Sequence, residues 1–426
     1  MAVQVLQRLE GSRIPVQAVL NRVLAYAACN PADAALCSEL CYGVLRMEIR
    51  LHWLLARFLK APAQLPPGMR YALLVGVYTL LFLEGMPAYA AVDWAVTSVK
   101  RKYGQTLARV ANGCLRAICR EGAAPRDYAY YRSAGQDELE QQAVYYSLPL
   151  WIVRLWHDGY GPDKAVLLMA KSSARPAAGF RVNKLRPDWE EVALQFENAG
   201  ARRLASSCVI VEPAIRAQVE AQCPLTTLLV EGGLSRQGAA SQLALHTMTP
   251  GIWPDPIWDA CAGQGTKSCA LLEFGKNVSM SSDTHLPRLR RIHSECRRLH
   301  LPKPLVIQAS VLHPPIRCKI GTIVLDVPCS GLGVLASRPD IRRHRKAADV
   351  QALLHLQASM LEAAYAALAP GGHIVYITCT QNPAENTEQI RAMLGRHPAA
   401  ALAQEWNSPV EHMLLEGMYA ALLVKR

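Results

Sequence analysis

The stretch IWDACAGQGTK, residues 257–267, contains the pattern on which the fold assignment depends. A short apolar run ends in a turn with two glycines, and this turn leads directly into a helix-forming segment. Glycines let the backbone of such a turn approach a ligand closely, and the helix N-terminus offers unpaired N–H groups. Strand, glycine turn and helix in this order are typical of the first unit of a Rossmann-like domain, although similar turns also occur without a ligand.

The same rhythm of short apolar runs and amphipathic helices continues from Pro254 to the C-terminus. It predicts a parallel sheet that helices cover on both faces, within a Rossmann-like domain at residues 251–426. Strands are expected at residues 257–261, 278–282, 305–308, 322–327, 373–378 and 419–424, and helices at 267–274, 286–299, 350–368 and 385–394.

The rest of the chain follows other patterns, and we expect three domains in all. In residues 1–126 apolar residues recur every three or four positions, which predicts an all-helical domain. Residues 127–148 are polar and irregular and favour a linker. Residues 149–250 mix helical stretches with extended ones, as in a small α+β domain. Helices are expected at residues 3–9, 14–27, 34–45, 51–59, 69–83, 89–102 and 107–119, and middle-domain strands at 178–183 and 209–212.

The charge of the chain is unevenly distributed. The 426 residues include 46 Lys and Arg against 34 Asp and Glu, a net charge of +12. Residues 1–126 hold 15 basic and 7 acidic residues, and residues 284–346 hold 13 and 3. Each basic stretch could neutralise phosphates, which favours a polyanionic partner and salt-dependent binding. A solvated cationic surface without a partner is the alternative.

Cysteine usage and the N-terminus favour a cytoplasmic protein with reduced thiols. None of the thirteen cysteines forms a CxxC pair, so neither a disulfide framework nor a metal site is expected. The N-terminal MAVQVLQRLEGSR lacks the apolar core of a signal peptide, and the longest apolar run, residues 71–83, is too short to span a bilayer. We expect no membrane association and a monomer.

Three further predicted strands end in residues that could do chemistry. Asp283 ends the second strand, where nucleoside-binding Rossmann units place a carboxylate on the ribose hydroxyls. Asp326 and Cys329 follow the fourth strand, and Cys379 follows the fifth. A thiol at this rim could be partly exposed, with Lys267 or Arg338 stabilising its thiolate, whereas a lone cysteine is more often a small buried apolar residue.

Two longer motifs carry a resemblance to a known family. The stretches DVPCSGLGV (326–334) with RPDI (338–341), and YITCTQNPAEN (376–386), resemble the proline-cysteine and threonine-cysteine motifs of RNA cytosine-C5 methyltransferases. The similarity is to the Sun/RsmB type, which acts on bacterial 16S ribosomal RNA. LCSELCYGVLR (36–46) and ANGCLR (111–116) resemble helices of the NusB-like RNA-binding domain that precedes the catalytic part in that family. The resemblance covers nearly the whole chain.

The resemblance implies a mechanism for the strand-end residues. Cys379 would add to carbon 6 of a cytosine, because carbon 5 is a poor nucleophile until the ring becomes enamine-like. Asp326 would hydrogen-bond the base edge, and Cys329 would serve release of the product. Lys267 resembles the family's site lysine. The target base would have to leave its stack to reach these groups.

The resemblance also implies S-adenosyl-L-methionine as the cofactor. The residues expected to bind it are Cys261, Ala262, Gly263, Gln264, Gly265, Thr266, Lys267, Asp283, Ser310 and Asp326. Three departures from the family pattern fall on this side. Gln264 and Thr266 replace the usual proline and a glycine, Ser310 aligns with a usual Asp, and Gly238 replaces the Asp of a Gln-Asp-x-Ser pattern.

Three functions are consistent with these residues. Methylation of carbon 5 of a cytosine in RNA, with 16S ribosomal RNA as the substrate, is favoured by the retained Cys379, Cys329 and Asp326. A non-catalytic RNA-binding protein with the same fold is the alternative that Thr266 and Ser310 favour. The third is the same chemistry on transfer RNA. The helical domain favours ribosomal RNA, by analogy alone.

Overall fold

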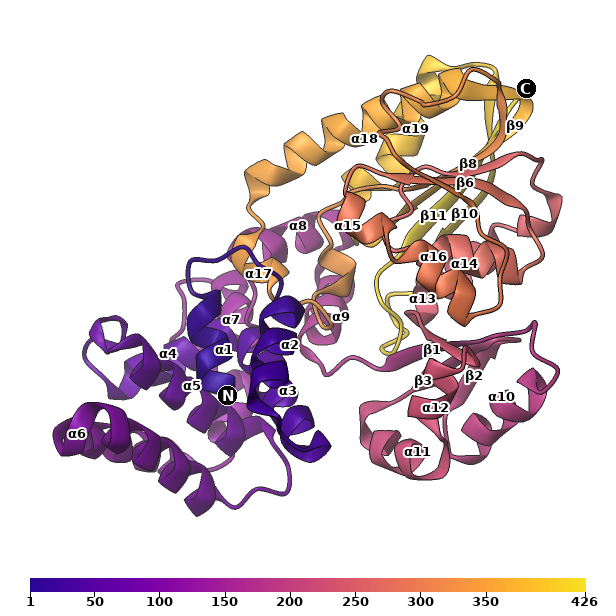
Figure 1. Cartoon of the computed structure of the whole chain (residues 1–426). Helices are drawn as coiled ribbons and strands as arrows, with labels where there is room; N and C mark the ends of the chain where they lie inside the picture. The colour runs from indigo at the N-terminus through magenta and orange to yellow at the C-terminus, as the bar shows by residue number, and fades with distance from the viewer. The chain divides into compact units, whose positions relative to one another are not determined.

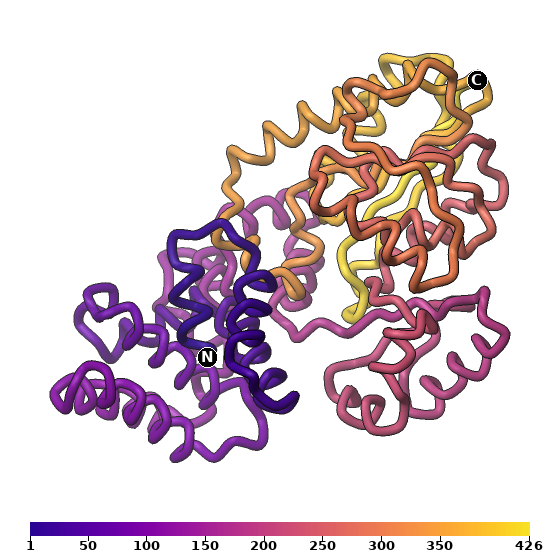
Figure 2. Tube along the Cα trace, viewed as in Figure 1, coloured from indigo at the N-terminus to yellow at the C-terminus, as the bar shows by residue number.

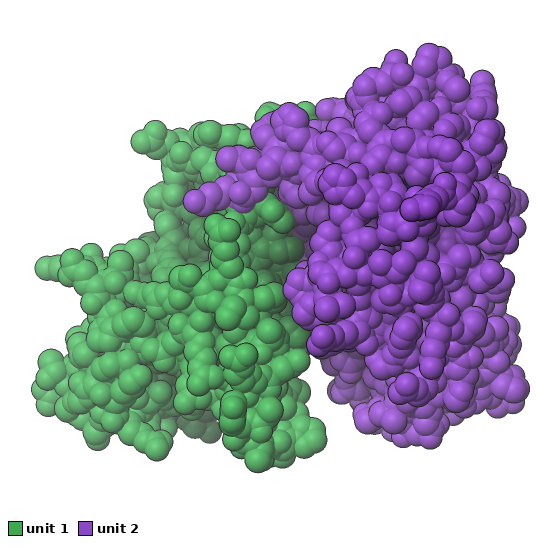
Figure 3. Space-filling model, turned by 45° about the horizontal axis from the view of Figure 1, so that its top comes forward, with its two compact units in different colours: residues 1–175, 335–345 green, residues 176–334, 346–426 purple.

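The computed structural model describes all 426 residues, and the chain forms two compact units. Unit 1 comprises residues 1–175 and 335–345, and unit 2 comprises residues 176–334 and 346–426 (Figure 3). Residues 335–345, which follow the proline-cysteine motif, therefore belong to unit 1, although the residues before and after them in the sequence belong to unit 2. No helix is long and apolar enough to cross a membrane.

Unit 1 is all-helical, as the periodicity of residues 1–126 predicts (Figure 1). Gly104 has φ 85° and ψ 177°, so α6 bends where the sequence predicts a break between two helices. The helices are α1 (Ala2–Leu9), α2 (Val16–Ala27), α3 (Pro31–Arg46), α4 (Glu48–Phe58), α5 (Pro67–Phe82), α6 (Ala88–Arg120), α7 (Glu138–Tyr145), α8 (Leu150–Tyr160), α9 (Pro162–Ser173) and α17 (Ile341–His344).

Helix α5 forms the centre of this unit. Its residues are apolar around almost the whole circumference and 12 of the 16 are buried, as expected for a helix inside a bundle. Helix α3 approaches α5 closely at Gly43, where an added Cβ would lie 2.0 Å from the Tyr78 ring. A glycine is therefore needed where α3 crosses α5. Figure 2 shows the Cα trace, in which the N-terminal helices α1, α2 and α3 lie together.

Residues 127–148 are folded, in contrast to the expected linker. They contain a 3-10 helix, Tyr128–Tyr131, and helix α7, and Tyr131 is completely buried. The Arg50 guanidinium lies over the rings of Tyr131 and Tyr145, at 4.7 and 4.2 Å from their centroids. The tyrosines that pack around the Arg50 cation form a core. The polar composition of residues 127–148 gives no indication of this core. The two compact units do not test the expected division into three domains, which therefore stays a prediction.

Unit 2 begins with a four-stranded antiparallel sheet, which fits the expected small α+β domain. Its strand order is β2-β3-β1-β4. Two of the strands, β2 and β4, were not predicted, because they are only 4 and 3 residues long and contain arginines. The elements are β1 (Ala178–Val182), α10 (Trp189–Asn198), β2 (Arg202–Ala205), β3 (Cys208–Val211), α11 (Arg216–Gln222), α12 (Leu225–Val230), β4 (Leu234–Arg236) and α13 (Ala239–Thr247).

A seven-stranded sheet in the order β10-β11-β9-β8-β5-β6-β7 forms the rest of unit 2. The predicted Rossmann-like class is confirmed, but the sheet is mixed, because β11 pairs antiparallel with both β9 and β10. The edge strand β10 was missed, since its residues are exposed or half-buried and its apolar stretch, residues 400–403, is mostly alanine, which is not typical of strands. The elements are β5 (Ile257–Asp259), α14 (Thr266–Glu273), β6 (Val278–Asp283), α15 (Leu286–Leu289), α16 (Ile292–Arg298), β7 (Leu305–Gln308), β8 (Ile320–Asp326), α18 (Ala347–Ala367), β9 (Leu368–Thr378), α19 (Thr387–Arg396), β10 (Ala400–Asn407) and β11 (Tyr419–Lys425).

The strand order determines where a ligand can bind. After β5 the chain moves outward through β6 and β7, and it then returns to the other side of β5 as β8. The loops that follow β5 and β8 therefore run in opposite directions and leave a crevice at the carboxyl ends of the two strands. The glycine turn and the proline-cysteine motif are these two loops.

Segment 335–345 is held in unit 1 by a buried arginine. The Arg342 guanidinium donates to the backbone oxygens of Arg46 at 2.7 Å and Ser147 at 2.9 Å, and also to that of Ser172. Burial lowers the pKa of Arg342, which nonetheless remains a cation at neutral pH. Arg343 forms an ion pair with Glu48 at 3.0 Å. These two charges of the basic stretch 284–346 therefore serve packing, which corrects the expectation that the whole stretch meets phosphate.

Replacing Arg342 with Met should destabilise unit 1 by about 2–4 kcal/mol, because several buried carbonyl oxygens would lose their donors. The measurement is the midpoint of urea and thermal unfolding. Arg338 belongs to the same segment but is exposed, so Arg338→Ala should change stability by less than about 0.5 kcal/mol. Equal effects of the two substitutions would contradict this account of the segment.

Candidate active site

The loop between β5 and α14 is shaped by its two glycines. Gly263 and Gly265 have φ values of 55° and 82°, in the left-handed region that favours glycine. An added Cβ at Gly265 would lie 2.8 Å from the Ile292 side chain. A Cβ added at Gly263 would have no other atom within 4 Å. Gly263 therefore leaves open space at the rim of the sheet, where backbone can approach a ligand.

Asp283 joins this loop to the end of β6. Its carboxylate accepts the N–H of Gly263 at 3.0 Å and the N–H of His285 at 2.7 Å. The carboxylate is half-buried and lies at the carboxyl end of the strand next to β5. This is the position from which a Rossmann unit binds ribose hydroxyls, so the loop and Asp283 together fit a nucleoside.

A lysine and an aspartate form an ion pair across the crevice. Lys267, in the first turn of α14, donates to Asp326 at the end of β8 over 2.6 Å. Burial alone would lower the pKa of Lys267, but the Asp326 carboxylate raises it above its ordinary value, and Cys379 adds to this effect. A raised lysine pKa means that the Lys267 ammonium keeps its charge at neutral pH and loses it only in strongly alkaline solution.

The two motif cysteines lie side by side. Their sulfur atoms are 3.3 Å apart, and the backbone N–H of Cys379 also points to the Cys329 sulfur at 3.3 Å. The parallel pairing of β8 with β9, in which Asp326 lies opposite Ile377, brings the two loops together. The hydrogen bond to Cys379 and burial both raise the pKa of Cys329 well above its ordinary value. Cys329 therefore stays a thiol at neutral pH.

Comparison with known proteins shows which family the chain is similar to. The family described as 16S rRNA methyltransferase RsmB/F matches residues 252–423, and the NusB family matches residues 1–120. The ribosomal RNA small subunit methyltransferase B of Vibrio vulnificus is 31% identical, over 94% of this chain and 93% of that one. The corresponding probable enzyme of Bacillus subtilis is 29% identical, over 93% and 88%.

The chain belongs to the RsmB/F methyltransferase family. The predicted family, the enzyme class and S-adenosyl-L-methionine as the cofactor are thereby confirmed. Solved structures agree on the fold. PH0851 has a TM-score of 0.76 at 20% identity and covers 99% of this chain and 97% of its own. NSun6 from Pyrococcus horikoshii has a TM-score of 0.54 at 18% identity and covers 65% and 98%.

The departures of this RsmB/F chain in the cofactor loop leave the backbone intact. Thr266 is the first residue of α14, is exposed and has no positive φ, so this position does not require glycine. Gln264 is also exposed and accepts a hydrogen bond from Arg291 at 3.1 Å. Ser310 follows β7, and its hydroxyl accepts the N–H of Leu312 at 3.2 Å. Among these three, only Ser310 removes a charge from the crevice.

The lost Asp at position 238 has a substitute in another part of the chain. Helix α13 begins after Gly238, and the N–H of Ala240 donates to the Glu416 carboxylate at 3.2 Å. A Cβ on Gly238 would lie 2.4 Å from the same carboxylate. Glu416 thus occupies the space of a side chain at 238 and places a negative charge at the helix N-terminus, where it is favourable.

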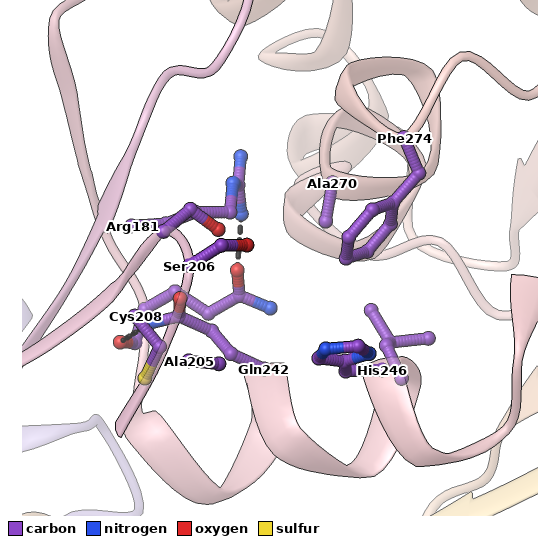
Figure 4. A pocket seen from close by; sticks show the side chains of 11 residues that line it. Arg181, Ala205, Ser206, Cys208, Gln242, His246, Ala270 and Phe274 are labelled. Atoms are coloured by element: carbon purple, nitrogen blue, oxygen red, sulfur yellow. Dashed lines mark hydrogen bonds between the residues drawn. The ribbon is translucent and has the colours of Figure 1, made fainter. Parts of the chain in front are cut away.

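Other residues that support the cofactor loop had not been recognised in the sequence. Arg181 of β1 donates to both carboxylate oxygens of Glu273, at 2.8 and 3.0 Å, to the side chain of Gln237 and to the Thr266 backbone oxygen. The cluster borders the small pocket in Figure 4, which lies between the small sheet and helices α13 and α14. Asp259 is completely buried, which raises its pKa to about 6, and accepts from Ser268 at 2.6 Å. Arg181 and Glu273 are far apart in the sequence, so no local sequence pattern indicates that they form a buried pair.

The structure brings four of the predicted site residues together. Lys267, Asp326, Cys329 and Cys379 lie around one crevice in unit 2. Arg338, considered as a cation for the thiolates, belongs to unit 1. Cys261 lies in the loop, and burial raises the pKa of its thiol well above the ordinary value. Cys261 is therefore no candidate nucleophile. Ala262 is buried and supports the turn by donating to the Ser282 oxygen at 2.9 Å.

Replacing Asp283 with Asn should weaken S-adenosyl-L-methionine binding by about 10- to 100-fold, because charge-assisted hydrogen bonds to the loop and the ligand would be lost. Calorimetry with the purified chain measures this. Thr266→Gly is the matched control and should change Kd by less than about threefold, since the residue is exposed and helical. A large gain of affinity in the glycine variant would contradict the interpretation of position 266.

Proposed function

We propose that this RsmB/F chain methylates carbon 5 of a cytosine in 16S ribosomal RNA through a covalent bond between Cys379 and carbon 6. The observation that carries the proposal is the pair of cysteines 3.3 Å apart, next to the Lys267–Asp326 ion pair and the cofactor loop. The names of the relatives support ribosomal RNA as the substrate.

Each group in the crevice has one task in the proposed reaction. S-adenosyl-L-methionine, when bound, supplies an electrophilic methyl group. Asp326 accepts a hydrogen bond from the edge of the flipped base, and Lys267 fixes the Asp326 carboxylate and favours the thiolate of Cys379. The thiolate adds to carbon 6, and the ring electrons move toward carbon 5.

The second half of the reaction restores the enzyme. Carbon 5 would form a bond to the methyl group while the bond from that group to the cofactor sulfur breaks and leaves S-adenosyl-L-homocysteine. The proton on carbon 5 then leaves to a base. The electrons of that C–H bond form the C5–C6 double bond, which expels Cys379 as a thiolate. Cys329 can accept this proton only as a thiolate, so its own proton must first pass to solvent. The hydrogen bond with Cys379 is the largest cause of its raised pKa, and that bond is lost once Cys379 is a thioether, so deprotonation of Cys329 becomes easier at this stage.

An exposed basic face gives the RNA a place to bind in unit 2. Arg288, Arg290, Arg291 and Arg297 on and between α15 and α16 are exposed, and Gln264 of the cofactor loop accepts from one of them. Exposed arginines attract phosphate. We propose that these residues, and not the buried Arg342, account for the RNA affinity of the stretch 284–346. A ribosomal RNA substrate also makes the cytoplasm the proposed site of action.

Cys379→Ala should abolish methyl transfer while the chain stays folded, because the side chain is only half-buried and small. Transfer of a radioactive methyl group to 16S ribosomal RNA and to transfer RNA measures activity, and thermal unfolding serves as the control. Turnover by the variant would exclude Cys379 as the nucleophile. Methylation of transfer RNA alone by the wild type would support the alternative substrate. Binding of RNA without any transfer would support the non-catalytic alternative.

Cys329→Ala should retain the first half of the reaction and lose release. We expect an RNA–protein adduct that survives denaturing electrophoresis and that disappears in the Cys329→Ala/Cys379→Ala double variant. Absence of an adduct from the single variant, with normal S-adenosyl-L-methionine binding, would count against the release role of Cys329.

A further inference from the structure

Glu385 is a completely buried carboxylate directly beneath the two cysteine loops. Its first oxygen accepts the backbone N–H of Ser330 at 2.8 Å and the side-chain amide of Gln357 at 3.0 Å. Its second oxygen accepts the side-chain amide of Asn382 at 2.9 Å and the Ser330 hydroxyl. Four donors and no acceptor surround the group, which is the environment of an ionised carboxylate.

This carboxylate fixes the backbone on both sides of Cys329. Ser330, the next residue, is bound through both its N–H and its hydroxyl. Pro328, the preceding residue, accepts from the same Gln357 amide group that binds Glu385, at 2.9 Å. The Ser330 hydroxyl lies 2.7 Å from that of Thr380, the residue after Cys379. One buried group therefore ties the two cysteine loops to each other.

The charges around the two sulfur atoms differ in sign. No lysine, arginine or histidine forms an ion pair with Glu385, so its negative charge acts on the neighbouring Cys329. The protonated Lys267, by contrast, interacts with Cys379. The Tyr376 phenol is a further ionisable neighbour of Cys329, and it donates to the Glu385 backbone oxygen at 2.7 Å. Glu385 adds to the effects of Cys379 and burial that raise the pKa of Cys329.

We propose that Glu385 is the positioning residue that separates the roles of the two cysteines. It holds the Cys329 loop against the Cys379 loop, and its charge keeps Cys329 protonated so that only Cys379 is the resting nucleophile. The proposal rests on the proposed function, because the roles that it separates are nucleophile and release base. It explains why two thiols 3.3 Å apart do not compete for the same carbon.

The first test follows Cys329 without RNA or cofactor. In the Cys379→Ala background, iodoacetamide alkylation of Cys329 is measured by mass spectrometry of the peptide as a function of pH. Glu385→Gln keeps the shape and removes the charge, so the midpoint of the profile should move down by about one pH unit, or about tenfold in rate below the midpoint. A faster reaction with an unchanged midpoint would mean that the variant only loosens the loop, and would overturn the electrostatic role.

Two matched variants accompany this measurement. Glu362 of α18 is a carboxylate bound by Arg396 and His397 away from the cysteines, so Glu362→Gln should leave the profile unchanged. Glu385→Asp keeps the charge and shortens the reach, so it should retain the midpoint of the wild type. A shift in either control equal to that of Glu385→Gln would overturn the proposal.

The second test uses the intact site. With both cysteines present, Glu385→Gln should lower kcat at least about tenfold while KM for S-adenosyl-L-methionine changes less than about twofold, since the cofactor loop is not touched. Should that variant not fold, Gln357→Met removes the donor to Pro328 and should lower kcat with an unshifted alkylation midpoint. An unchanged kcat in the folded variant overturns the positioning role. A wild type without methyl transfer would refute the proposed function and leave the alkylation test valid.

Discussion

The register of β8 on β9 is the constraint on which the site depends. The two strands run in parallel, with Val324 opposite Val375 and Asp326 opposite Ile377. Cys329 lies three residues beyond Asp326 and Cys379 two residues beyond Ile377, so both cysteines follow the same end of the paired strands and meet at 3.3 Å. Because side chains alternate along a strand, a slip by one residue would turn every residue of one strand to the opposite face. The completely buried β8 core excludes such a slip.

Buried charges then connect this rim to the remainder of each unit. In unit 2, Arg181 ties the small sheet to α14, and Glu385 ties the two cysteine loops to α18 through Gln357. In unit 1, Arg342 holds the segment that follows the proline-cysteine motif. Nearly all of their hydrogen-bonding atoms have partners, which is the condition under which a buried charge is tolerated. Each of these contacts fixes backbone geometry at or next to a motif.

The departures from the RsmB/F pattern become intelligible in the same terms. At position 266 the family glycine is dispensable, because the two residues with positive φ, Gly263 and Gly265, are retained. At position 238 the Glu416 carboxylate takes the space and the capping position of a missing Asp. Only Ser310 is a loss of charge without a visible substitute. The changes on the cofactor side therefore argue much less for loss of activity than they do in the sequence alone.

The sequence by itself determined the elements and the motifs. Apolar periodicity located the helices of residues 1–126 and six strands of the large sheet, and the glycine turn and the two cysteine motifs indicated the site residues, because these signals are local. It did not reveal β10, the folded state of residues 127–148, or the partners of Arg181, Arg342 and Glu385. Even the quoted YITCTQNPAEN contained Glu385 without indicating its role. Those features were decided by tertiary structure, since burial and hydrogen bonding join residues tens to hundreds of positions apart and only the folded chain brings them within 3 Å.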